Sequence, residues 1–179
     1  MNASSLLSPR PLNLLGFAAC AGLMTAALFL QYAEGLEPCP LCILQRIAVM
    51  LLGAVFLLAA LHNPAAVGRR IYAGAALLVS FGGAGIAARH VWLQHLPPEA
   101  VPPCGPGMDY ILDTFPLGKA LGIILRGSGD CAAVDWTWLG LSIPGWTLVA
   151  FVGFCVLALF LLLYRFPPAG GLRFSARMR

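Results

Sequence analysis

Charged side chains are scarce in this sequence of 179 residues: Asp, Glu, Lys and Arg make up only 10% of it, against about 25% in ordinary soluble domains. Apolar residues reach 60%, whereas soluble domains hold about 45–50%. This balance excludes both a water-soluble fold and a disordered chain. The glycines and prolines show no collagen-like period, and no repeat of about 20–50 residues is present. The composition therefore predicts a compact membrane protein.

Four apolar segments are long enough to cross a bilayer, which needs about 20 apolar residues per helix. They cover about residues 13–32, 43–61, 71–92 and 146–164. The first is long for a signal peptide and follows little positive charge beyond Arg10, so we expect it to be retained. The third contains small residues that let helices approach closely, namely Gly74, Gly82, Gly83 and Gly85. The sequence thus predicts an all-α bundle of four transmembrane helices, a single domain over residues 1–179.

The charged residues are divided between the two ends of this predicted bundle. One side holds the basic residues Arg10, Arg69, Arg70, Arg165, Arg173, Arg177 and Arg179. The other holds all seven acids, which are Glu34, Glu37, Glu99, Asp109, Asp113, Asp130 and Asp135. By the positive-inside rule the basic side, with both termini, is cytoplasmic, and in a bacterium the acidic side is periplasmic. The net charge of +4 reflects this topology, and we expect no nucleic-acid partner.

A long outer segment joins the third and fourth spans, over about residues 94–145. Its beginning, LPPEAVPPCGPG, contains too much Pro and Gly for a regular helix, so we expect an extended, mobile loop. After Pro116 the apolar positions recur with a helical period, at Leu117, Ala120, Leu121 and Ile124. This pattern predicts a short amphipathic helix on the membrane surface. The tryptophans before the fourth span are typical of an interfacial aromatic belt, namely Trp136, Trp138 and Trp146.

The six cysteines fall into two groups in this topology. Cys20 and Cys155 lie inside the first and fourth spans, where we expect them to pack as small apolar residues. The other four lie on the outer side and are Cys39, Cys42, Cys104 and Cys131. Disulfides persist in an oxidising compartment such as the periplasm. The even number and common side of these four cysteines therefore indicate two disulfides.

The first two outer cysteines form a C-x-x-C motif at the start of the second span. A helix N-terminus stabilises a thiolate, which favours a redox-active pair. Arg46 follows Cys42 by four residues and Cys39 by seven, so all three share one helical face. Its charge favours the thiolate form of Cys42, although an arginine near a helix end also commonly extends to the membrane interface. Half of a zinc site is the alternative for C-x-x-C, but no second C-x-x-C or C-x-x-H follows, so we expect no metal.

Cys104 and Cys131 enclose 26 residues of the outer loop. A structural disulfide closing such a loop would stabilise the fold by about 3 kcal/mol. The Pro- and Gly-rich surroundings of Cys104 offer little rigid structure to hold, however, and an exposed disulfide on a mobile loop suits exchange with another protein. Near the outer end of the third span, His90 carries the same ambiguity as Arg46, and we expect Arg89 to anchor the helix in lipid headgroups.

Four motifs together resemble the DsbB family of bacterial inner-membrane disulfide bond formation proteins, over nearly the whole chain. They are PCPLCILQR at residues 38–46, CGPG at 104–107, GSGDC at 127–131 and WLGLSIPGW at 138–146. The DsbA, DsbB and quinone relay is already known to keep the periplasm oxidising. The resemblance implies a protein-disulfide:quinone oxidoreductase that reoxidises a DsbA-like thioredoxin-fold protein and passes the electrons to ubiquinone or menaquinone.

The resemblance also assigns roles to single residues. Cys39 and Cys42 match the membrane-proximal redox pair, while Cys104 and Cys131 match the loop pair, in which Cys104 forms the mixed disulfide with the partner. Cys42, Arg46 and His90 match residues beside the quinone. Two positions depart from the pattern of some members, Pro40 and Gln45. Their effect on the redox balance of the pair does not follow from the sequence.

Two other functional classes are compatible with the residues alone. A membrane disulfide reductase would move electrons outward, but it would favour paired cysteines within the spans. A non-enzymatic four-helix scaffold would use the outer disulfides only for structure. The oxidase needs a strong acceptor, because DsbA is itself an oxidant at about −120 mV. Since the sequence holds neither a G-x-G-x-x-G motif after a strand nor a C-x-x-C-H haem motif, a quinone is the simplest acceptor.

Overall fold

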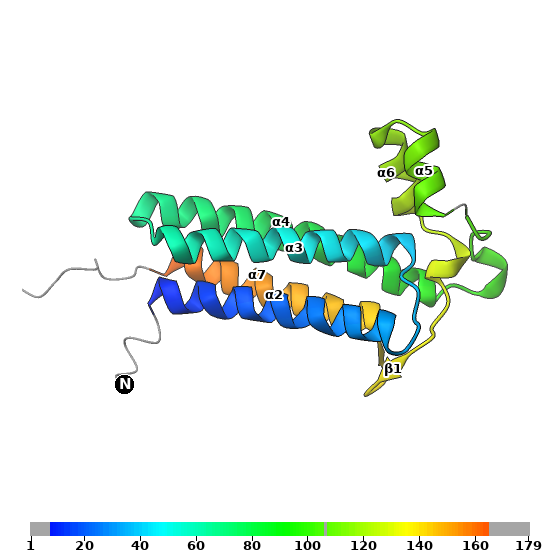
Figure 1. Cartoon of the computed structure of the whole chain (residues 1–179), viewed down its shortest axis with the longest axis horizontal. Coiled ribbons are helices and arrows are strands. Elements are labelled where there is room, and N and C mark those ends of the chain that lie inside the picture. Colours follow the sequence, from blue (N-terminus) through cyan, green and yellow to red (C-terminus); the bar gives the residue numbers. More distant parts are fainter. Residues whose placement is uncertain (1–7, 106, 165–179) are drawn as a thin grey trace, which may run out of the picture.

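The computed structural model describes residues 8–105 and 107–164. Four long helices dominate these residues: α2 (Pro9–Tyr32), α3 (Pro40–His62), α4 (Ala66–Gln94) and α7 (Ile143–Leu163). Each is long and apolar enough to cross a membrane. They run antiparallel to their sequence neighbours along the long axis of the molecule (Figure 1). The predicted four-helix membrane bundle is therefore confirmed.

The helices begin earlier than the predicted spans, because the predictions followed apolar residues and left out the polar or proline-containing residues at the start of each helix. At the start of α3, Cys39 is the N-cap and Pro40 occupies the first helical position, where the missing N–H costs no hydrogen bond. α7 begins similarly, with the Ser142 side chain accepting a hydrogen bond of 3.4 Å from the Gly145 N–H. α3 ends at His62 and is capped by Asn63, whose left-handed φ of 39° is typical of a helix C-terminus.

The core of the bundle is apolar, with Leu52, Phe56 and Phe151 almost fully buried. Gly83 of α4 allows the close approach of α7, because a Cβ atom there would lie 2.3 Å from the Phe151 ring. The other three glycines predicted to promote helix packing face open space. Outward-facing apolar side chains such as Leu78 and Phe81 are exposed, as expected of a surface that contacts lipid. Cys20 is buried in α2 and Cys155 half-buried in α7, as predicted.

The segment between α4 and α7 forms a small layer at one end of the bundle (Figure 1). It contains η1 (Pro98–Ala100), α5 (Met108–Thr114), α6 (Leu117–Arg126), η2 (Gly129–Cys131), β1 (Thr137–Trp138) and β2 (Leu141–Ser142). The predicted helix after Pro116 is confirmed as α6, whereas α5 and the β1–β2 hairpin were not predicted. Around Cys104, the described residues outside η1 form no regular structure.

α6 packs on the bundle through half of its predicted apolar face. Ala120 and Ile124 are buried with Leu41 and Leu93, which lie at the adjoining ends of α3 and α4. Leu117 and Leu121 remain exposed. The helix thus covers the start of α3 and keeps two apolar side chains on its outer surface; contact of this surface with lipid remains a prediction.

Arg89 has a different role from the predicted headgroup anchor. Its guanidinium donates hydrogen bonds to the carbonyl oxygens of Leu125, at 3.4 Å, and Arg126, at 2.9 Å. These carbonyls lie at the C-terminal end of α6, where a cation is favourable. The guanidinium also lies 4.2 Å from the centre of the Trp92 ring. Arg89 therefore fixes α6 to α4, an arrangement that a lone arginine in the sequence does not reveal.

Candidate thiol redox site

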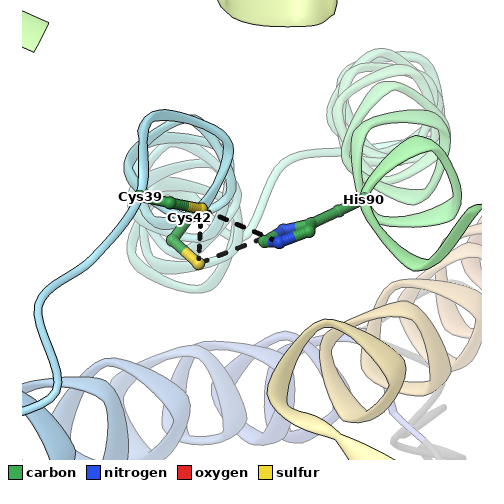
Figure 2. A group of neighbouring side chains, drawn as sticks. All are labelled: Cys39, Cys42 and His90. Carbon is green, nitrogen blue, oxygen red and sulfur yellow. Dashed lines mark hydrogen bonds between the residues drawn. The ribbon is translucent and has the colours of Figure 1, made fainter. Parts of the chain in front are cut away.

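Two predicted cysteines and the predicted histidine meet at the end of the bundle covered by α6. Cys39 and Cys42 lie one helical turn apart at the start of α3, and His90 reaches toward them from α4 (Figure 2). The two sulfur atoms are 3.4 Å apart. His90 Nε2 lies 3.7 Å from the Cys39 sulfur, and its Nδ1 lies 4.0 Å from the Cys42 sulfur. With only 2% of its surface exposed, His90 is a buried part of this site.

Gln45 also belongs to the site, although the sequence marked it only as a departure from the family pattern. Its side-chain nitrogen lies 3.1 Å from His90 Nδ1, and both residues are buried. As placed, the amide donates to Nδ1, so a neutral ring carries its proton on Nε2, which faces Cys39. Gln45 follows Cys42 by three residues, which places both side chains on the same face of the helix; this spacing could have identified Gln45 from the sequence.

Arg46 lies on the predicted face of α3 and is held by the neighbouring helix α2. It donates hydrogen bonds to the side-chain oxygen of Gln31 and, at 3.2 Å, to the carbonyl oxygen of Ala27. These bonds fix the guanidinium between α2 and α3 instead of extending it to the membrane interface. The positive charge consequently remains beside Cys42.

Cys131 is fully buried beneath α6 and next to Cys39. A hydrogen bond with Cys39, together with burial, raises the pKa of the Cys131 thiol above its ordinary value. Cys104, in contrast, is exposed. Its segment runs beside η2, where the Gly129 N–H donates a 3.2 Å hydrogen bond to the Pro103 carbonyl. All six cysteines are free thiols in this structure, so the two disulfide pairings remain predictions.

A cavity of about 410 Å³ adjoins the thiols. α2 and α7 contribute apolar side chains to its wall, including Leu23, Met24, Leu30, Ile143 and Val149. Cys39, Cys42, Gln45, Arg46 and His90 line it from α3 and α4. The three predicted belt tryptophans lie at its border, and Trp146 Nε1 donates a 3.0 Å hydrogen bond to the Trp138 carbonyl.

The cavity suits a flat apolar ring with polar oxygens. Its volume lies in the range of about 300–1,000 Å³ typical of small-molecule sites, which combine apolar walls with a few polar groups. The Arg46 guanidinium and the His90 ring can meet a carbonyl oxygen, while the alkyl side chains of α2 and α7 can contact an isoprenoid tail. The residues present therefore fit a membrane quinone.

Comparison with known proteins gives a consistent result over most of the chain. The sequence model of a family described as "Disulfide bond formation protein DsbB" matches residues 9–161. A relative named "Disulfide bond formation protein B" in Methylococcus capsulatus is 57% identical over 149 residues, covering 83% of this chain and 91% of the relative. Proteins with the same name are 55% identical in Hahella chejuensis and 54% identical in Nitrosococcus oceani. They cover 83% and 86% of this chain, and 90% of each relative.

Proposed function

This chain belongs to the DsbB family of disulfide bond formation proteins, and we propose that its four outer cysteines, Arg46 and His90 carry out the family's reaction. The protein is a protein-disulfide:quinone oxidoreductase that reoxidises DsbA. Family membership thus decides against a disulfide reductase and against a non-enzymatic scaffold. What remains to be argued is which side chain performs each step.

One observation carries the assignment: the C-x-x-C thiols and His90 converge at an apolar cavity that opens beside a membrane-spanning helix pair. A soluble partner can approach the outer end of the bundle, while a lipid-soluble acceptor can approach the same sulfur atoms from within the bilayer. A structural disulfide needs neither approach. The arrangement therefore supports two-electron transfer from a protein thiol to a quinone.

The first exchange uses the exposed loop cysteine. A thiolate of reduced DsbA attacks the sulfur of Cys104 in a Cys104–Cys131 disulfide, so that a mixed disulfide forms and Cys131 leaves as a thiolate. The second thiol of DsbA then attacks the DsbA sulfur of the mixed disulfide, which forms the DsbA disulfide and releases Cys104 as a thiolate. DsbA is oxidised by two electrons, and the loop pair is reduced by two. The exposure of Cys104 and the burial of Cys131 support Cys104 as the attacked sulfur, since exchange requires access.

The second exchange uses the contact between the two pairs. Cys131 lies against Cys39, so its thiolate can attack the Cys39 sulfur of a Cys39–Cys42 disulfide and release Cys42. Cys104 then attacks Cys131, which restores the loop disulfide and frees Cys39. The electrons have now moved from the loop pair to the C-x-x-C pair. This route needs Cys104 to approach Cys131, and the passage of its segment beside η2 supports that movement.

The final step takes place at the cavity. A quinone, ubiquinone or menaquinone, supplies an acceptor for two electrons and two protons when bound there. Cys42 lines the cavity, and the neighbouring Arg46 charge favours its thiolate. The His90 ring, directed by Gln45, can hold a proton between the two sulfur atoms and the cavity. The apolar side chains of α2 and α7 in the cavity wall lower the local dielectric constant, which strengthens the electrostatic effect of Arg46 on the thiolate.

The membrane orientation follows from the charges. Arg10, Arg69 and Arg70 lie at the end of the bundle opposite the thiols (Figure 1), whereas Arg165, Arg173, Arg177 and Arg179 lie outside the described residues. The seven acidic residues lie on the side of the thiols. By the positive-inside rule we assign the termini to the cytoplasm and the four cysteines to the periplasmic face of a bacterial inner membrane.

Quinone-dependent oxidation of DsbA tests the residue assignments. Purified full-length protein, reduced DsbA and a ubiquinone analogue should give quinol, followed by the loss of quinone absorbance. Cys104→Ser and Cys42→Ser should each abolish turnover, while Cys155→Ser, which removes a thiol from α7, should not. Full turnover by Cys104→Ser protein would disprove the proposed route from the loop to the cavity.

A further inference from the structure

The C-x-x-C thiols and His90 have the geometry of a metal-binding cluster. One ligand atom from each of Cys39, Cys42 and His90 lies within 4.8 Å of the others. Tetrahedral zinc, with Zn–S near 2.3 Å and Zn–N near 2.0–2.1 Å, places two sulfurs about 3.8 Å apart and a sulfur and nitrogen about 3.5 Å apart. The observed separations of 3.4 Å between the sulfurs and 3.7 Å between Cys39 and Nε2 differ from these by only a few tenths of an ångström. The remaining pair of ligand atoms lies within 4.8 Å, so a bound ion would draw the Cys42 sulfur and the His90 ring closer together.

The third donor comes from a different helix, which is why the motif alone did not indicate it. Cys39 and Cys42 belong to the start of α3, whereas His90 is 51 residues further along, in α4. Both helices are held in place by the bundle, so the three donors are gathered before any metal binds. Preorganisation of this kind removes much of the ordering cost of binding.

The surroundings suit a cation bound by two thiolates. Two thiolate charges balance a divalent cation, and Arg46, which favours the thiolate form, is directed toward Gln31 and Ala27 of α2. Three carboxylates, Glu37, Asp130 and Asp135, line the same cavity, and their negative charge favours a cation there. The Gln45 amide lies against Nδ1 of the ring, at 3.1 Å. When the amide turns so that its oxygen faces Nδ1, it accepts a hydrogen bond from Nδ1–H, and the ring proton on Nδ1 leaves Nε2 free to ligate.

We propose that the reduced enzyme binds a thiophilic divalent cation such as Zn²⁺ through Cys39, Cys42 and His90, with a water molecule as the fourth ligand. Binding releases the two thiol protons and changes no oxidation state. Because the same two sulfurs form the catalytic disulfide, metal binding and the oxidised state exclude each other. Zinc would therefore hold the C-x-x-C pair reduced and act as an inhibitor of the proposed reaction.

Cobalt(II) replaces zinc in such sites and reports the ligands optically. Titration of the reduced, full-length protein in detergent with Co²⁺ alone should give a thiolate-to-cobalt charge-transfer band in the near ultraviolet and the visible bands of tetrahedral cobalt. The bands should saturate at one equivalent and disappear when Zn²⁺ is added. Cys42→Ser and His90→Ala should each weaken the apparent affinity about tenfold or more.

Two comparisons keep the test independent of folding and of the redox function. The oxidised wild-type protein has the same sequence but no free thiols at the site, so it should show no bands; a Cys155→Ser protein should behave as wild type. Absence of bands in the reduced protein, or bands that form in Cys42→Ser with the affinity and intensity of the wild type, would overturn the proposal. Neither DsbA nor a quinone is present, so such a failure would leave the proposed oxidase function intact, and failure of that function would leave the metal site intact.

Discussion

The two loop cysteines differ strongly in their surroundings. Cys104 is exposed, whereas Cys131 is buried and its thiol pKa is raised by the hydrogen bond with Cys39 and by burial. In the reduced protein, Cys104 should therefore react with iodoacetamide roughly tenfold or more faster than Cys131, because reaction needs an accessible thiolate. Pulse alkylation followed by mass spectrometry measures both rates in one sample.

The raised pKa of the Cys131 thiol predicts that its alkylation rate and the stability of the reduced protein both depend on pH. A thiol whose pKa is higher in the folded than in the unfolded protein stabilises the fold below the unfolded value and loses that contribution as the pH rises above it. Cys131 alkylation should thus keep increasing through pH 9, and the free energy of unfolding of the reduced protein should fall more steeply from pH 7 to pH 9 than that of a Cys131→Ser variant treated identically. Equal rates for the two loop cysteines at pH 7 would contradict this difference between them.

Arg46 is the cation among the side chains that line the proposed acceptor site. Replacing it with Ala removes the charge that favours the Cys42 thiolate and a donor to a quinone oxygen. A hydrogen bond from a charged group is worth about 1.5–3 kcal/mol, so kcat/KM for a quinone analogue should fall roughly tenfold or more. Arg46→Lys should recover only part of the loss, because an ammonium cannot contact both Gln31 and Ala27 as a guanidinium does. Steady-state kinetics at varied quinone concentration provides the measurement. Arg70→Ala, at the other end of the bundle, is the control; an equal loss there would rule out a local role.

At the scale of helices, Gly83 controls the distance between α4 and α7. Because an added Cβ would lie 2.3 Å from the Phe151 ring, Gly83→Ala should lower the stability by about 1–3 kcal/mol through overpacking. Gly85→Ala, on the same helix but in open space, should not. Thermal unfolding in detergent distinguishes the two variants. A second substitution, Phe151→Leu, should restore part of the loss, and no rescue would mean that the ring is not the cause.

The contact between Arg89 and α6 keeps the outer layer over Cys131. Arg89→Gln removes the hydrogen bonds to the carbonyls of Leu125 and Arg126, so α6 should separate from α4 more often. Alkylation of reduced Cys131 should then accelerate by up to roughly tenfold, the equivalent of one charged hydrogen bond. Arg126→Gln removes a cation from the same helix end without breaking these bonds and is the matched control. An unchanged rate in Arg89→Gln would show that other contacts hold α6.

For the whole molecule, the orientation in the membrane is directly measurable. After treatment of intact cells with a membrane-impermeant reductant, which opens the proposed Cys104–Cys131 disulfide, a membrane-impermeant maleimide should label Cys104. In a Cys104→Ser background, a cysteine introduced by Ala65→Cys, in the exposed connection between α3 and α4, should be labelled only after the inner membrane is opened. The charge distribution requires this result. The reverse pattern would place the thiols in the cytoplasm and contradict the proposed periplasmic reaction.

Much of the molecule follows from the sequence because its strongest signals are local. Long apolar segments give the four helices, and a helical period gives α6. The C-x-x-C motif and Arg46 lie within two turns of one helix, so their common face is also readable. What could not be predicted depends on contacts between distant segments: His90 with Gln45, Arg89 with the end of α6, and Cys131 with Cys39. Gly83 shows the same limit, since three other glycines of α4 look equivalent until Phe151 is placed.

The wall of the cavity has one further consequence. α2 and α7 both line it but contact each other little, so we expect a membrane-borne acceptor to enter between these two helices. Under the proposed function, the acceptor and its reduced product exchange sideways, without passing through water. The quantity that governs saturation is then the mole fraction of quinone among the lipids, and dilution of the membrane with lipid should slow the enzyme even when the amount of quinone per volume stays constant.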